Sequence, residues 1–217
     1  MPKICKQPAS EIASLRSKRS VKKMGRAADE EIHFGVGKSS LGVVLVASSD
    51  KGVVSILMGD DGDELVHDLQ ERFPSAHLVH GRGDRESAEL VARVVEFIEM
   101  PACGLDLPLD IRGTVFQRRV WCEVREIPVG RTSTYSEIAH KIGAPKAMRA
   151  VGTACSTNNI ALAIPCHRVL RKDGALCGSI FRQGALISRE AVASKGPPIP
   201  LHPGLFHQIP LRKIPKT

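Results

Sequence analysis

One short run of the sequence combines a nucleophile with groups that could activate it. Cys166 is followed directly by His167 and Arg168, and Pro165 precedes it. A thiol attacks as the thiolate, and nearby cationic or hydrogen-bonding groups favour that form by lowering the pKa of the thiol. Proline has a fixed φ, which restricts the backbone that leads to the sulfur. The run therefore predicts an activated cysteine, although a structural cysteine buried beside a hydrogen-bonded histidine would show the same residues.

The remaining cysteines do not have the pattern of a metal site or a disulfide framework. No two of the six cysteines form a CxxC pair, which disfavours both a zinc ribbon and a set of disulfides. Most of the others are expected to be small buried hydrophobic side chains; they are Cys5, Cys103, Cys122, Cys155 and Cys177.

The composition is that of a soluble protein with one large or two small domains. The 217 residues are 42% hydrophobic and 25% charged, which are ordinary values for a globular fold. No apolar run approaches the roughly 18 residues that a membrane span needs, and the N-terminus lacks the apolar stretch of a secretory signal. We therefore expect a cytoplasmic protein with no membrane partner.

The net charge of +8 is divided unevenly along the chain. Residues 29–110 contain six Lys and Arg against seventeen Asp and Glu, whereas residues 111–195 contain fourteen against five. Residues 1–28 are basic as well and predict a flexible tail. An acidic half joined to a basic half indicates that the basic half meets a polyanion such as DNA, although two merely solvated halves fit the charges equally well.

Residues 29–110 have the pattern of a small N-terminal α+β domain. Short β-branched runs separated by tight turns predict a three-stranded antiparallel sheet, and apolar residues at helical spacing predict two helices. Nothing in this part indicates chemistry, and the segment 101–112 is expected to connect it to a second domain. The strands are expected at about 32–36, 41–47 and 53–58, and the helices at about 64–73 and 87–100.

Residues 111–195 predict a winged helix-turn-helix domain. Helices are expected at about 114–125, 135–142 and 145–156. Thr134 and Glu137 form a capping-box pattern before the second helix, and Pro145 is expected in the first turn of the third. The second and third helices form a helix-turn-helix candidate, although many helix pairs with this spacing never touch DNA. Its outward side chains would include Lys146, Arg149 and Thr153.

A hairpin and a closing helix are expected after the helix pair. Residues 168–177 predict a hairpin with Asp173 and Gly174 at a type I′ turn, which would form the wing. A short helix is expected at 185–193. Residues 196–217 contain six prolines and no apolar periodicity, so they are expected to be a disordered tail.

The Pro-Cys-His-Arg-Val run at residues 165–169 resembles the active-site signature of the O6-alkylguanine-DNA alkyltransferases, the methylated-DNA–protein-cysteine methyltransferase family. The likeness extends from about residue 31 to residue 190 and is strongest to the C-terminal half of the bacterial Ada protein. An extended match of this kind is highly specific. Further matching stretches lie at 57–61, 107–114 and 143–151.

The resemblance implies a fold and a reaction. The family joins a ribonuclease-H-like sheet domain to a winged helix. Cys166 corresponds to the alkyl acceptor, His167 to the base that withdraws its proton through a water, and Glu190 to the carboxylate that orients the histidine. Asn158 corresponds to an asparagine that braces the turn before the active site. The alkyl group moves irreversibly from O6-alkylguanine to the thiol, so each molecule would act once and would need no metal or other cofactor.

The resemblance also implies how DNA is handled. The target oxygen lies inside the duplex, so the base must be flipped out. Arg149 corresponds to an arginine finger that fills the vacated place, and Tyr135, the one tyrosine of the chain, corresponds to a residue that hydrogen-bonds the flipped base. The expected partner is double-stranded DNA with O6-alkylguanine, with O4-alkylthymine as a further candidate substrate. The protein is expected to be a monomer that associates with the nucleoid when it binds DNA.

The chain departs from the family pattern in one loop. The family continues Gly-Tyr-Arg-Trp-Gly after the wing, whereas residues 178–184 are Gly-Ser-Ile-Phe-Arg-Gln-Gly. Ser179 stands where an aromatic side chain is expected to contact the flipped base, and losing such a contact predicts a reaction about tenfold to a hundredfold slower. The altered loop leaves open a non-catalytic winged-helix protein that binds alkylated DNA. A cysteine hydrolase is disfavoured because no oxyanion-hole loop is apparent.

Overall fold

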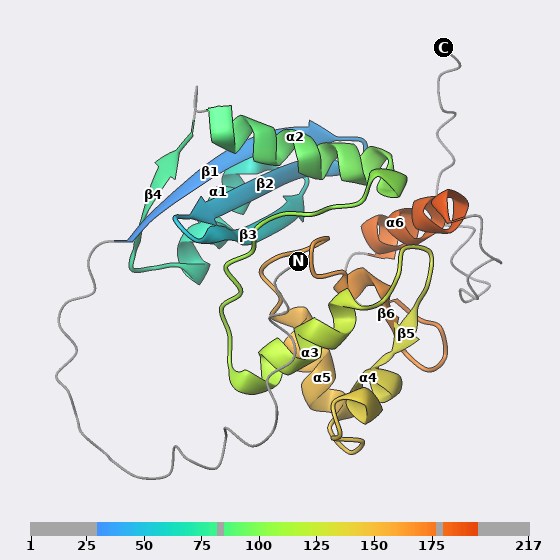
Figure 1. The fold of residues 1–217 in the computed structure, drawn as a ribbon. Helices are drawn as coiled ribbons and strands as arrows, with labels where there is room; N and C mark the ends of the chain where they lie inside the picture. The colour runs from blue at the N-terminus through green and yellow to red at the C-terminus, as the bar shows by residue number, and fades with distance from the viewer. Residues whose placement is uncertain (1–29, 82–84, 177–179, 195–217) are drawn as a thin grey trace, which may run out of the picture.

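The computed structural model describes residues 30–81, 85–176 and 180–194, which form a sheet layer and a helical layer (Figure 1). The predicted tails, 1–28 and 196–217, lie outside these residues, as does Ser179. None of the described helices has the length and apolar character needed to cross a bilayer. The strands are β1 (Glu30–Ser39), β2 (Gly42–Ser49), β3 (Gly52–Gly59), β4 (Ala76–His80), β5 (Ser133–Thr134) and β6 (Val169–Leu170). The helices are α1 (Gly62–Arg72), α2 (Arg85–Glu99), α3 (Val115–Arg125), α4 (Tyr135–Lys141), α5 (Met148–Ser156) and α6 (Ile180–Ala193), with short 3-10 helices η2 (Pro101–Cys103) and η3 (Cys166–Arg168).

In the described residues the main sheet has four strands, in the order β3-β2-β1-β4. The predicted strands β1, β2 and β3 are present and pair antiparallel. The additional strand, β4, pairs parallel to β1. It is a five-residue edge strand in which no residue is fully buried, so its apolar pattern is too weak to identify it. The prediction of a three-stranded, purely antiparallel sheet was therefore wrong.

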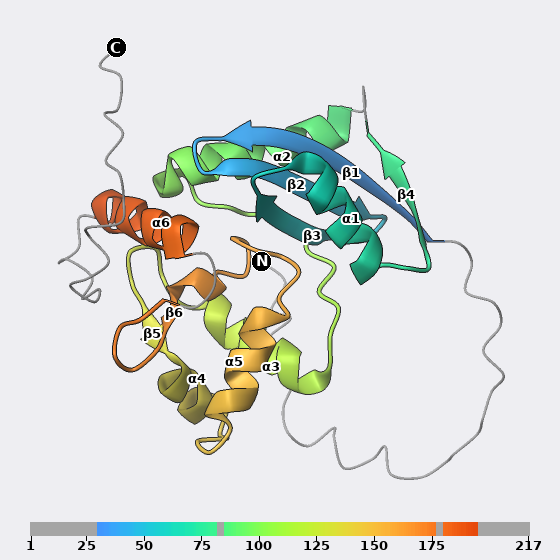
Figure 2. The ribbon, with the colours of Figure 1, turned by 180° about the vertical axis from the view of Figure 1, so that it is seen from behind.

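Helices cover both faces of this sheet (Figure 2). On one face Leu65 of α1 packs in a buried cluster with Leu45 of β2. On the other face Val94 of α2 belongs to the main core with Val44 of β2. Neighbouring residues of a strand point to opposite faces. The centre of β2 is therefore apolar throughout, since both of its faces are buried.

The free edge of β3 is paired with segments from outside the sheet. The Val53 N–H donates to the Pro108 carbonyl at 2.8 Å in the connecting segment. Further along, the Ile56 N–H donates to the Asn159 carbonyl at 2.8 Å, and the Ala161 N–H donates back to Ile56. The edge is thereby satisfied, and the main core continues from the sheet into α3, α4 and α5. The loop that follows α5 is thus attached to the sheet.

Side-chain caps determine where the first helices of the helical layer begin. The Thr134 hydroxyl accepts from the Glu137 N–H, and the Glu137 carboxylate accepts from the Thr134 N–H at 2.7 Å. The capping box predicted for α4 is therefore confirmed. Thr114 and Gln117 form the same motif at the start of α3.

The helix with the predicted DNA-contacting residues begins later than expected. Its first residue is Met148 rather than Pro145. The Ala147 N–H donates to the Ala144 carbonyl at 2.8 Å and closes a turn around the proline, whose fixed φ suits the second position of such a turn as well as a first helical turn. α3 holds α5 in place, because the indole N–H of Trp121 donates to a carbonyl of α5 at 2.8 Å.

The predicted turn after β6 has another geometry. The Gly174 N–H donates to the Arg171 carbonyl at 2.9 Å, and the Arg171 N–H donates to the Ala175 carbonyl at 3.1 Å. Gly174 has a φ of +77°, but Asp173 does not have a positive φ, whereas a type I′ turn needs both. This is the three-residue hairpin loop in which a left-handed glycine follows the turn. The residues described after this turn form no strand as far as residue 176, and β6 pairs in parallel with β5 instead.

Gly130 should not accept a side chain. It has a φ of +72°, and a Cβ there would lie 2.0 Å from the Ser194 hydroxyl oxygen and 2.9 Å from the Glu190 carbonyl oxygen. Gly130→Ala should lower the free energy of unfolding by about 2–4 kcal/mol, because the left-handed backbone and the steric clash both cost energy. Gly104 has the same φ with no atom within 4 Å of a Cβ, so Gly104→Ala should cost only about 1 kcal/mol. Chemical denaturation measures both losses, and equal losses would contradict the expectation.

Candidate functional site

Cys166 lies at the end of a tightly turned loop. Leu162 has a φ of +68°, and its two neighbours are joined by a 2.8 Å backbone hydrogen bond across it, which is the rare and strained form of γ-turn. Pro165 forms an inverse γ-turn, with φ −79° and ψ 62°, closed by the Cys166 N–H donating to the Ile164 carbonyl at 2.7 Å. Leu162 is only 4% exposed, so core packing holds a conformation that costs on the order of 1–3 kcal/mol. The two turns determine where the backbone presents the sulfur.

Asn158 braces this loop from its other end. Its side-chain N–H group donates to the Ile164 carbonyl at 2.9 Å and to the Cys166 Sγ at 3.3 Å. Its Oδ1 accepts from the Ile160 N–H at 3.0 Å. One amide side chain therefore joins the two ends of the loop and also contacts the sulfur.

A buried carboxylate lies behind the residues that follow the cysteine. Glu190 on α6 is 1% exposed, and its Oε1 lies 2.8 Å from His167 Nε2. Arg168, also buried, donates two hydrogen bonds of 2.9 Å to the same carboxylate and another to the Ile127 carbonyl at 2.6 Å. Burial alone would raise the pKa of Glu190, but the hydrogen bonds from His167 and Arg168 outweigh it and hold the pKa at about 2. The carboxylate is therefore ionised at neutral pH.

The two residues that follow Cys166 in sequence do not activate its thiol at rest. His167 and Arg168 bond to Glu190 rather than to the sulfur. Contact with the Cys155 thiol and burial raise the pKa of Cys166 above its ordinary value, and the hydrogen bond from Asn158 offsets only part of this. The prediction that these neighbouring groups lower the pKa of Cys166 was therefore wrong, because His167 and Arg168 already bond to a buried carboxylate and do little to stabilise a thiolate.

The residues expected to contact DNA lie mainly at the surface of the helical layer. Arg149 and Thr153 on α5 are exposed, as is Lys146 in the preceding turn. Val151, on the other side of α5, is fully buried in the main core. Tyr135 begins α4 and packs partly buried against the same core. α5 therefore has a polar, basic outer face.

Gln183 and Cys155 lie beside the site and were not foreseen. Gln183 on α6 is 7% exposed and donates to the His167 carbonyl at 2.9 Å. The Cys155 side chain on α5 lies close enough to the Cys166 thiol to raise the pKa of Cys166, and the Cys155 carbonyl accepts from the Asn158 N–H at 3.3 Å. Gln183 falls in the stretch 178–184 that departs from the family pattern, which was expected to be a loop but is helical from Ile180, so no match indicates it. Cys155 follows the buried Val151 by four residues, and this helical spacing is the signal that could have placed it inside.

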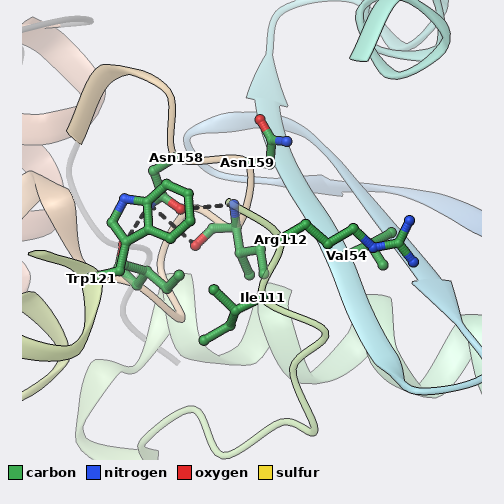
Figure 3. A pocket seen from close by; sticks show the side chains of 8 residues that line it. Val54, Ile111, Arg112, Trp121, Asn158 and Asn159 are labelled. Atoms are coloured by element: carbon green, nitrogen blue, oxygen red, sulfur yellow. Dashed lines mark hydrogen bonds between the residues drawn. The ribbon is translucent and has the colours of Figure 1, made fainter. Parts of the chain in front are cut away.

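A small pocket lies where the sheet meets the helical layer (Figure 3). Val54 and Arg112 lie toward one side of it and Trp121 and Asn158 toward the other. Cys166 does not line it, so this pocket is not the expected base-binding site. Among the described residues no three His, Cys, Asp or Glu side chains gather where they could hold a metal ion. The pocket is lined by Val54, Ile111, Arg112, Trp121, Asn158, Asn159, Ile160 and Ile164.

Known proteins resemble this chain in sequence and in fold. Residues 115–194 match the family described as 6-O-methylguanine DNA methyltransferase, DNA binding domain. The bifunctional transcriptional activator/DNA repair enzyme Ada of Escherichia coli is 42% identical over 163 residues, which are 74% of this chain and 46% of Ada. The inducible methylated-DNA–protein-cysteine methyltransferase of Bacillus subtilis is 34% identical over 67% of this chain and 75% of its own length. The crystal structure of Mycobacterium tuberculosis OGT in complex with DNA superposes with a TM-score of 0.60 and 33% identity, over 74% of this chain and 94% of that one.

The mixed α+β fold, with a four-stranded sheet and a helical layer that carries the cysteine loop, is the architecture of the OGT structures. The chain belongs to the methylated-DNA–protein-cysteine methyltransferase family. It spans about half the length of the Ada proteins that it matches.

The Glu190 pairing should make stability depend on acid pH. The pKa of Glu190 is about 2 in the folded protein against an ordinary 4.5, and a carboxyl group whose pKa is lowered by folding stabilises the fold above the unfolded value and stops doing so as pH falls through the folded one. We expect about 3 kcal/mol to be present above pH 5 and to disappear between about pH 5 and 2.

The variant Glu190→Gln isolates the contribution of Glu190 to the pH dependence of stability. The variant should be less stable at pH 7, because Arg168 loses its charged partner. Its free energy of unfolding should then fall less between pH 5 and 2 than that of the wild type. Glu30 and Asp110, whose pKa values are also lowered in the folded protein, titrate in both proteins and cancel in the difference. Parallel curves of unfolding free energy against pH would rule out the assignment.

Proposed function

We propose that the protein repairs DNA by moving an alkyl group from O6-alkylguanine onto the sulfur of Cys166, with O4-alkylthymine as a further candidate substrate. The thiolate attacks the alkyl carbon, the carbon–oxygen bond breaks, and guanine leaves with its O6 oxygen restored while a thioether forms. The displacement needs no metal or redox cofactor, and the thioether makes it a single event for each molecule. The observation that carries the proposal is the 2.8 Å hydrogen bond between His167 and the buried Glu190, directly behind the cysteine.

We assign His167 as the base. Its Nε2 is engaged with Glu190, which leaves Nδ1 to take the thiol proton through a water. Glu190 would then stabilise the imidazolium that forms, and Arg168 keeps that carboxylate ionised. Because the pKa of Cys166 is raised at rest, the sulfur stays a neutral thiol between encounters, and a neutral thiol oxidises more slowly than a thiolate.

We propose that residues 111–195 form a winged helix-turn-helix unit that binds duplex DNA, and that residues 29–110 form the N-terminal α+β unit packed against it. The exposed basic face of α5, with Lys146 and Thr153 beside Arg149, supports this role. Arg149 would fill the place of the flipped base, and Tyr135 would hydrogen-bond that base. The structure of the related OGT with DNA supports DNA as the partner. The protein would act as a cytoplasmic monomer, bound to the nucleoid while it scans for lesions.

Labelled lesion DNA tests the reaction. Wild-type protein is incubated with a duplex in which the methyl group of O6-methylguanine is labelled, and intact-protein and peptide mass spectrometry locate the label. We expect one methyl group per molecule, on Cys166, and none in Cys166→Ala. Cys103→Ala, which removes an exposed cysteine, should react like the wild type.

Two results would defeat the proposal. The first is an unlabelled wild-type protein when a known family member is labelled in parallel. The second is tight lesion binding that Cys166→Ala leaves unchanged, with no thioether in the wild type. That second result would establish a non-catalytic protein that binds alkylated DNA.

Arg149 should matter only when a base must leave a duplex. Arg149→Ala should slow transfer from duplex DNA roughly tenfold to a hundredfold, because unstacking a base costs a few kcal/mol. Transfer from a free O6-alkylguanine base, which needs no flipping, should proceed at the wild-type rate. Arg85→Ala, which removes an exposed arginine of α2, serves as the control for lost positive charge. Equal slowing with both substrates would show that Arg149 acts in some other way.

A further inference from the structure

α6 carries the groups that orient the active histidine. Glu190 lies 2.8 Å from His167 Nε2, and Gln183 donates to the His167 carbonyl at 2.9 Å. Both side chains are buried. Any displacement of α6 therefore moves the carboxylate relative to the imidazole, so the position of this helix determines the geometry of the base.

Arg189, next to Glu190 in sequence, reaches the sheet layer instead. It donates to the Ile98 carbonyl at 2.7 Å and to the Ser40 hydroxyl at 2.7 Å, and lies 3.3 Å from the Glu99 carboxylate. Glu99 in turn accepts from the Ser40 N–H and hydroxyl at 2.7 Å each. One guanidinium thus joins α6 to the C-terminal end of α2, where carbonyls favour a cation, and to the turn between β1 and β2.

A second arginine of α6 makes a parallel connection. Arg182 donates to the Leu41 carbonyl at 3.1 Å and bonds to Asp60. Arg182 and Arg189 are seven residues apart, which is about two helical turns, so they lie on the same side of α6. Figures 1 and 2 show this helix beside the end of α2. The sheet layer thus holds α6 at two points along its length.

We infer that Arg189 is a positioning residue for the alkyl transfer, because its fork to Ile98 and Ser40 sets the place of α6 and hence the contact between Glu190 and His167. The inference rests on the proposed function. It assigns the sheet layer a part in the reaction although that layer carries no reacting group. A small misplacement of a catalytic group can slow a reaction by up to about a hundredfold, so the effect should appear in the rate.

A purely structural role would look different. The Arg189 side chain is 30% exposed and that of Glu99 is 43% exposed, and ion pairs at the surface contribute little to stability. Loss of Arg189 should therefore leave the fold and the affinity for DNA nearly intact, while the contact between Glu190 and His167 becomes less well fixed. The titratable and charged groups around this connection are Glu99 from α2, facing Arg189, and His167 and Arg168, facing Glu190.

The test compares Arg189→Met with wild type in the full chain, well below both melting temperatures. Single-turnover transfer from lesion DNA is followed against pH, and the affinity for lesion DNA is measured separately. We expect a rate constant roughly tenfold lower at neutral pH and an affinity within about twofold of the wild type. The acid limb of the pH profile should move to lower pH, because His167 holds a proton less tightly when the Glu190 carboxylate is farther away. Arg85→Met, a change in an arginine paired only within α2, should match the wild type in all three.

Arg189→Lys separates charge from geometry. Lysine keeps the charge but cannot reach both acceptors with a rigid fork, so its rate should lie between those of wild type and Arg189→Met. A full wild-type rate in Arg189→Lys, or an Arg189→Met protein with unchanged rate and pH profile, would overturn the inference. If wild-type protein itself transfers no alkyl group, the proposed function fails instead, which the same experiment shows directly.

Discussion

The Glu190 carboxylate constrains the rest of the structure. A charge with almost no access to water must be paired, and its partners are the consecutive residues His167 and Arg168. Because α6 provides the carboxylate and the loop after α5 provides its partners, α6 has to pack against that loop. Breaking such a buried pair typically costs about 3–5 kcal/mol, a large share of the stability of a domain. The orientation of the base is therefore maintained by the same interaction that keeps the fold closed.

The same pairing accounts for the resting state of the nucleophile. With both neighbouring side chains bonded to Glu190, the Cys166 sulfur interacts with the amide of Asn158 and the thiol of Cys155, and burial keeps the pKa of Cys166 raised. A fully activated thiolate would be exposed to oxidation in the absence of a substrate. A base held in place but separated from the thiol allows the proton to leave when a substrate is bound. Burial thus keeps the thiol of Cys166 unreactive at rest, whereas a different group, His167, makes it reactive once a substrate is bound.

The sequence predicted correctly those features that depend on interactions between residues close together in the chain. The capping box at Thr134 and the three β-branched strands are both encoded within a few residues. What was missed depends on distant partners. β4 is defined by its pairing with β1 rather than by its own pattern. The pKa of Cys166 is raised by burial and by Cys155, while the charge of Arg168 is paired with Glu190, 22 residues further along the chain. The parts assigned to Glu190 and Asn158 came from family resemblance, because no spacing rule connects either residue to the cysteine.

The sheet layer has no reacting group, yet it contacts both segments that carry the site. The Asn159 carbonyl accepts from the Ile56 N–H at 2.8 Å and from the Ser55 hydroxyl at 3.1 Å, and the Asn159 side chain accepts from Arg72 at 2.7 Å. A loop that contains a left-handed leucine persists only where its surroundings over-determine it, and this pairing along β3 supplies such surroundings. α6 is bonded to the same layer from the other side of the site. The sheet layer therefore holds both the cysteine loop and α6, and it fixes the separation of the thiol and His167 more rigidly than the helical layer could by itself. This gives a physical reason for a sheet domain in a protein whose reacting groups lie in the helical layer.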